Sequence, residues 1–66
     1  MSDEDIYRWN FLVETTDVED RVYLNDDEFV GTRREAEKEA KRLADEYELE
    51  YGALVTDTEL ERRGRA

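Results

Sequence analysis

The sequence predicts an α+β fold, with a small antiparallel sheet of three to four strands and one helix packed on one face. From Ile6 to Thr15, aromatic and polar residues alternate, which is typical of a half-buried strand. After Thr32, apolar residues recur at the spacing of one helical face, which is typical of an amphipathic helix. A strand-like segment follows, so the predicted order is ββαβ, or βββαβ if a short strand precedes the helix.

The first two strands are expected to form an antiparallel hairpin. Residues 17–20 are predicted to be its loop and residues 21–24 its second strand. A turn is predicted at residues 25–27, because Asn and Asp tolerate turn conformations. Phe29 and Val30 either form a short third strand or lead directly into the helix. The residues expected on the buried face of the first strand are Tyr7, Trp9, Phe11 and Val13.

The helix is predicted over residues 33–48. Thr32 and Glu35 match a capping box, in which each side chain satisfies the backbone amide of the other residue. Charged residues on the outer faces pair at i,i+3 or i,i+4 spacing, so the helix surface neutralises itself. The expected pairs are Glu35/Lys38, Glu37/Lys41, Glu39/Arg42, Lys41/Asp45 and Arg42/Glu46.

Two patterns compete where the helix ends. Apolar residues alternate after residue 48, which favours a final strand at about 50–56. Alternatively, the helix continues to Tyr51 and Gly52 is the residue just past its end. In either case, a short last helical turn could begin at Thr58.

The chain is predicted to hold one α+β domain over residues 6–58. Residues 1–5 are expected to be a flexible acidic leader, and residues 59–66 a short Arg-rich tail. Both flanking segments are expected to be mobile, because chain ends are poorly ordered unless something ties them down.

No catalytic apparatus is visible in the sequence. The chain has no Cys and no His, and its one Ser is Ser2 in the leader. Nucleophilic catalysis therefore lacks an activated nucleophile, and a tetrahedral zinc site lacks its usual ligands. Neither acidic stretch, 17–20 or 25–28, supplies the Gly and Glu of an EF-hand loop. We expect no enzymatic activity, no cofactor and no metal, and a function carried out by binding.

The negative charge is concentrated in the first half of the chain. Residues 1–31 hold ten acids and two bases, which gives −8, and residues 32–66 hold ten acids and eight bases, which gives −2. Such a field repels nucleic acid and anionic membranes and attracts basic surfaces. We expect a basic, nucleic-acid-binding protein as the partner, with no direct nucleic-acid or membrane binding. The acidic N-terminus and the lack of Cys favour the cytoplasm.

The acidic excess has two explanations. In size and charge the chain resembles the class of small phage-encoded DNA-mimic inhibitors, which includes anti-CRISPR and anti-restriction proteins. This resemblance in composition implies an inhibitor or regulator acting in the host cytoplasm. The alternative is a halophile-adapted small structural or assembly protein. Such a protein would use its sheet edge to form a homodimer or to assemble with a partner. Salt adaptation should spread acid over every face, so its concentration in one half favours recognition.

The partner-binding residues are expected in the two acidic connections of the hairpin region. Turn and loop residues add little to packing and often carry function. We expect the two connections to lie at the two ends of the sheet, away from the bases of the helix. Carboxylates on the helix, such as Glu37, Glu39 and Glu46, are expected to matter less. The predicted partner-binding residues are Glu14, Asp17, Glu19, Asp20, Asp26, Asp27 and Glu28.

Overall fold

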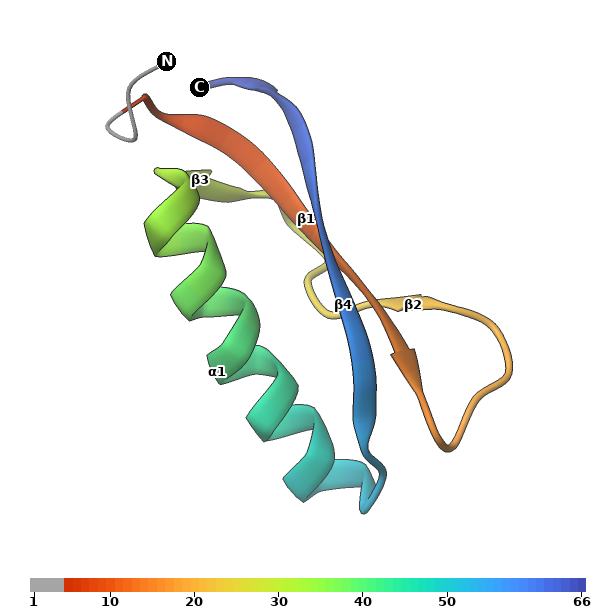
Figure 1. Ribbon diagram of the computed structural model, residues 1–66. Coiled ribbons are helices and arrows are strands. Elements are labelled where there is room, and N and C mark those ends of the chain that lie inside the picture. The colour runs from red at the N-terminus through yellow and green to blue at the C-terminus, as the bar shows by residue number, and fades with distance from the viewer. Residues whose placement is uncertain (1–4) are drawn as a thin grey trace.

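The strands form one antiparallel sheet built around the first strand, with the helix lying along one side of it (Figure 1). The computed structural model describes residues 5–66. The predicted α+β fold is confirmed, and the order of the elements is βββαβ. The elements are β1 (Tyr7–Thr15), β2 (Val22–Tyr23), β3 (Phe29–Gly31), α1 (Arg33–Tyr51) and β4 (Val55–Arg65).

Strand β1 is the centre of the sheet because both of its edges are paired. On one edge β4 runs antiparallel to it over its whole length. On the other edge, β3 pairs with the first part of β1, where Trp9 faces Phe29, and β2 pairs with the last part, where Leu12 faces Tyr23. The short strands β2 and β3 therefore lie end to end along the same edge, and the predicted β1–β2 hairpin is confirmed.

The core lies between the sheet and α1. Phe11 and Val13 are fully buried and Trp9 is nearly so, which confirms that the alternating pattern marks a buried face. Ala36 and Ala40 of α1 are buried against this face. Because alanine side chains are small, the helix lies close to the aromatic residues of the sheet.

The gap between β2 and β3 is bridged by the side chain of Asn25. The Phe11 amide donates to Asn25 Oδ1 at 3.0 Å, and Asn25 Nδ2 donates to the Trp9 carbonyl at 3.1 Å. The same Nδ2 donates to the carbonyl of Asp27 at 2.9 Å, within the predicted turn. One side-chain amide thus gives the middle of β1 the hydrogen bonds that a neighbouring strand would otherwise supply.

The helix begins as predicted and ends later than predicted. The Glu35 amide donates to the Thr32 hydroxyl and the Thr32 amide donates to the Glu35 carboxylate, which confirms the capping box. The prediction of a helix ending at 48 and a strand at about 50–56 is wrong, because α1 continues to Tyr51 and β4 starts at Val55. Gly52 stops the helix with a left-handed φ of 65°, and its amide donates to the Glu48 carbonyl.

Replacing Gly52 with alanine is expected to lower the free energy of unfolding by about 1 kcal/mol, because a Cβ disfavours the left-handed conformation. A Cβ added at this position meets no atom within 4 Å, so the loss is conformational and not steric. Urea denaturation followed by circular dichroism measures it. Gly52→Asn is the control and should lose less, since Asn tolerates this conformation. A Gly52→Ala variant as stable as the parent chain would contradict this view of the helix end.

The segment predicted as an Arg-rich tail belongs to the sheet. Residues 59–65 lie in β4, opposite the first half of β1, so the predicted mobile tail and the helical turn from Thr58 are both wrong. Arg62 lies 4.8 Å above the centre of the Tyr7 ring, and Arg65 lies 3.9 Å from the Asp5 carboxylate. Pairing with β1 fixes these residues, although their own sequence is too polar to suggest a strand. Residues 1–4 of the predicted leader lie outside the described residues.

The face of the sheet away from α1 is covered by charged side chains that pair with one another. Arg21 bridges Glu14 and Glu59, at 3.0 and 3.1 Å. Arg63 donates to Asn10 Oδ1 at 2.8 Å and forms an ion pair with Glu61 at 3.2 Å. This face therefore neutralises part of the acidic charge. On the helix, the predicted pairs of Arg42 with Glu39 and Glu46 are confirmed.

Candidate functional site

A cleft of about 280 Å³ lies between β2, the loop that follows it, and the second half of α1. Five of its residues belong to α1. They lie on one side of the helix, because they recur at steps of three or four along it. The other three come from β2 and the loop. We call it the acidic cleft, and its lining residues are Tyr23, Leu24, Asp26, Leu43, Glu46, Tyr47, Glu50 and Tyr51.

Two tyrosine rings form the helix wall of the acidic cleft. Tyr47 and Tyr51 are four residues apart, and their ring centres are 4.5 Å apart with a tilt of 44°. The Tyr47 hydroxyl donates to both carboxylate oxygens of Asp17 at 3.0 Å, which ties the β1–β2 loop to α1. Tyr47 thus has a fixed orientation in the wall.

The contact between Asp17 and Tyr47 shifts both groups. The Thr15 hydroxyl, and after it the Tyr47 hydroxyl, lower the pKa of Asp17, because they stabilise its charged form. Loss of solvent around the phenol raises the pKa of Tyr47, and the neighbouring Asp17 raises it further. At neutral pH, Asp17 is therefore ionised and Tyr47 remains a neutral hydrogen-bond donor.

Three carboxylates line the acidic cleft: Asp26 from the loop, and Glu46 and Glu50 from the helix. Glu46 accepts a hydrogen bond from Arg42 at 2.9 Å. Within residues 5–66, neither Asp26 nor Glu50 forms a side-chain hydrogen bond or an ion pair. Carboxylates accept strong hydrogen bonds from guanidinium and ammonium groups, and tyrosine faces attract cations. The acidic cleft is therefore suited to the side chain of an arginine or lysine.

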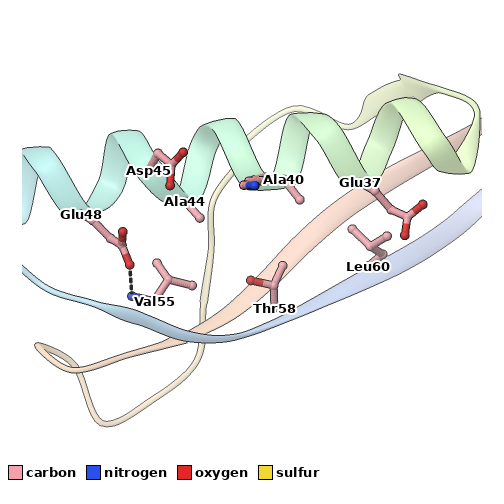
Figure 2. A pocket seen from close by; sticks show the side chains of 9 residues that line it. Glu37, Ala40, Ala44, Asp45, Glu48, Val55, Thr58 and Leu60 are labelled. Atoms are coloured by element: carbon pink, nitrogen blue, oxygen red, sulfur yellow. Dashed lines mark hydrogen bonds between the residues drawn. The ribbon is translucent and has the colours of Figure 1, made fainter.

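A second hollow of about 370 Å³ runs between α1 and β4 (Figure 2). Its floor contains Ala40 and Ala44 of the helix and Val55 and Leu60 of β4. At one end, the Val55 amide donates to the Glu48 carboxylate at 2.8 Å, the bond dashed in Figure 2. We call this hollow the β4 groove. It lies on the opposite side of α1 from the acidic cleft and has a more apolar floor.

Only one of the two predicted acidic connections lies at an end of the sheet. The β1–β2 loop, with Asp17, projects at one end of the sheet (Figure 1). The loop after β2 lies beside the middle of β1, where Asn25 bonds to Phe11. The expectation that this loop lies at the opposite end is wrong, because β2 and β3 share one edge of β1.

The predicted partner-binding residues fall into three groups. Glu14 and Glu28 form ion pairs with Arg21 and Arg8, so part of their charge is compensated. Asp17 and Asp26 lie at or beside the acidic cleft. The remaining residues are exposed, and their carboxylates form no hydrogen bond or ion pair with residues 5–66; they are Glu19, Asp20 and Asp27.

Two residues of the acidic cleft, Glu46 and Glu50, were not among the predicted partner-binding residues. Glu46 was expected to contribute little to partner binding, because it belongs to the helix surface whose charges pair with one another. The signal in the sequence is their spacing of four, each next to a tyrosine of the same helix side. That spacing places them on one side of α1, but only the packing of the loop brings Asp26 opposite them.

Comparison with protein-family models, curated proteins and solved structures gave no match. Within residues 5–66, no cluster of three carboxylates has a geometry that could hold a metal ion. No helix in the same part of the chain is long and apolar enough to cross a membrane.

Proposed function

We propose that this protein is a non-enzymatic acidic binding protein that inhibits or regulates a basic, nucleic-acid-binding protein. Its carboxylates take the place of nucleic-acid phosphates in the partner's basic site, as in the phage anti-defence proteins that it resembles in size and charge. It acts in the cytoplasm of the host cell. The observation that carries the proposal is the acidic cleft, where carboxylates of the loop and of α1 meet tyrosine rings.

The chemistry of the acidic cleft matches an arginine side chain in two ways. A guanidinium group donates several hydrogen bonds in a plane, which suits carboxylates such as Asp26 and Glu50. Its flat face also packs on aromatic rings such as Tyr51. Arginines that bind phosphate use the same donors, so a partner whose arginines enter this cleft loses them for nucleic acid.

Further carboxylates extend the negative surface beyond the acidic cleft. Glu19 and Asp20 project from the end of the sheet without a compensating base among the described residues. Charges at such a rim mainly accelerate encounter with an oppositely charged partner. Glu14 contributes less to this field because Arg21 lies 3.0 Å away. The loop therefore steers a basic partner and the cleft holds it.

Replacing Glu50 or Asp26 with lysine is expected to weaken binding of a short arginine-rich peptide about tenfold, equivalent to about 1.4 kcal/mol. Each change removes an uncompensated carboxylate from the cleft and adds a repelling charge. Isothermal titration calorimetry at about 0.15 M salt measures the affinity. The matched control is Glu37→Lys, which changes the net charge equally on the side of α1 that faces away from the acidic cleft, and it should change affinity by less than about twofold.

Equal losses in Glu37→Lys and Glu50→Lys would show that affinity follows net charge alone, against the role of the cleft. A gel shift at about 50 mM salt, where phosphate contacts are strongest, tests charge mimicry itself. Clear retardation of DNA or RNA by the protein would contradict it. A pull-down from host lysate should recover a nucleic-acid-binding protein that added DNA releases from the column.

A further inference from the structure

Strand β4 has a long free edge. It spans 11 residues and is hydrogen-bonded to β1 on one side. Among residues 5–66, no strand pairs with its other side. Beyond Val55, whose amide donates to the Glu48 carboxylate, this edge presents a row of backbone donors and acceptors to another chain. In Figure 1, β4 crosses in front of β1 and runs beside α1, with which it lines the β4 groove.

Apolar surface continues from this edge into the β4 groove. Val55 and Leu60 line the groove and are only half-buried. At the start of β4, Leu54 is 63% exposed, and the neighbouring Leu49 of α1 is 87% exposed. Both leucines line a hollow that adjoins the groove. A strand paired to the free edge would place its own side chains over the groove, because alternate side chains of a strand point to the helix face.

The charges of β4 identify what fits this edge. Along β4 the acids come before the bases, the acids being Asp57, Glu59 and Glu61 and the bases Arg62, Arg63 and Arg65. When two copies of such a strand pair antiparallel, the acidic half of each lies beside the basic half of the other. A strand of single charge, acidic or basic, would be repelled by one half. The edge is therefore complementary to itself.

We propose that two copies of this chain pair antiparallel through the free edges of β4. A twofold axis normal to the sheet relates the copies, as in an isologous interface. The two sheets become one continuous sheet, and both helices lie on the same face of it, so that the two β4 grooves meet at the centre. A domain of this size without disulfides is commonly stabilised by oligomerisation. The acidic clefts lie on the far sides of the helices and stay open.

Two charge variants of β4 test the pairing. One carries Asp57→Lys and Glu59→Lys, which gives its β4 a net positive charge, and the other carries Arg63→Glu and Arg65→Glu, which gives its β4 a net negative charge. Size-exclusion chromatography with light scattering should give twice the chain mass of 7.9 kDa for the parent protein. Each variant alone should dimerise at least about tenfold more weakly, because like charges now face each other. An equal mixture of the two should restore a dimer.

Circular dichroism checks that each variant is folded, and recovery of the dimer on mixing excludes unfolding as the cause. Amide hydrogen exchange gives a second readout, since β4 amides on the free edge should gain protection as protein concentration rises. A parent protein that remains monomeric, with exchange independent of concentration, overturns the proposal. The proposal is also overturned if both charge variants still dimerise and Val30→Asn disrupts the dimer, because Val30 lies at the opposite border of the sheet. Protection that appears only with the arginine-rich peptide would assign the edge to a partner strand instead, and would also overturn it.

Discussion

Replacing Phe11 with alanine is expected to leave the domain mostly unfolded at 25 °C. The Phe11 ring is fully buried, and it packs against Trp9 and the small residues of α1, with the Phe29 ring centre 6.0 Å away. Truncating a buried phenylalanine lowers the free energy of unfolding by about 3–5 kcal/mol. The core of a domain of this size rarely supplies more than about 3–5 kcal/mol in total. The single change therefore removes most of the stability.

Urea denaturation followed by tryptophan fluorescence measures this loss, because Trp9 lies in the same core. Val30→Ala is the matched control. Val30 is on the neighbouring strand β3 and is 55% exposed, so its truncation should change the free energy of unfolding by less than about 0.5 kcal/mol. A Phe11→Ala variant that loses less than about 1 kcal/mol would mean that the core does not close around this ring.

Replacing Asn25 with alanine is expected to lower the free energy of unfolding by about 2–3 kcal/mol. The change removes the acceptor of the Phe11 amide and the donor to the Trp9 carbonyl in the middle of the sheet. A buried backbone group left without a partner costs about 1–3 kcal/mol. No strand can take over, because β2 ends before this point and β3 begins after it.

Thermal and urea denaturation measure the loss at Asn25, and hydrogen exchange localises it, since the Phe11 amide should exchange faster in Asn25→Ala. Asp27→Ala is the control from the same loop. The Asp27 carbonyl accepts a hydrogen bond from Asn25, but the Asp27 carboxylate forms no hydrogen bond or ion pair with the described residues, so its loss should change stability by less than about 0.5 kcal/mol. Equal effects of the two changes would show that the loop as a whole matters, and not the bridging amide.

Asp17 and Asp26 were predicted from composition and position; Asp26 lines the acidic cleft, and Asp17 accepts a hydrogen bond from Tyr47 in its wall. Glu50 was not predicted, because its own neighbourhood in sequence is that of an ordinary solvent-exposed helix residue. Glu14 and Glu28 were predicted from the same acidic stretches, yet arginines of other strands pair with them. The number of carboxylates is a property of the sequence, but which of them remain uncompensated depends on which chain segments lie side by side.

The sequence by itself determined the elements whose pattern is local. The alternation from Tyr7 to Val13 marked β1 and its buried face, and Thr32 with Glu35 marked the start of α1. The two-residue period of a strand, the 3.6-residue period of a helix and a capping box each involve only residues close in sequence. No tertiary information is therefore needed to recognise them.

Only the tertiary structure decided the rest. The charged segment from Glu59 to Arg65 has no apolar pattern strong enough to mark a strand, and it becomes one because β1 offers a long edge that accepts its backbone hydrogen bonds. The end of α1 was open in the sequence between two patterns, and the left-handed turn at Gly52 fixed it. Asn25 resembles any turn residue until β2 and β3 are placed on one edge of β1, which leaves a gap that its amide fills. The pairing of β4 and the role of Asn25 depend on hydrogen bonds between residues far apart in the chain, and local periodicity does not encode such partners.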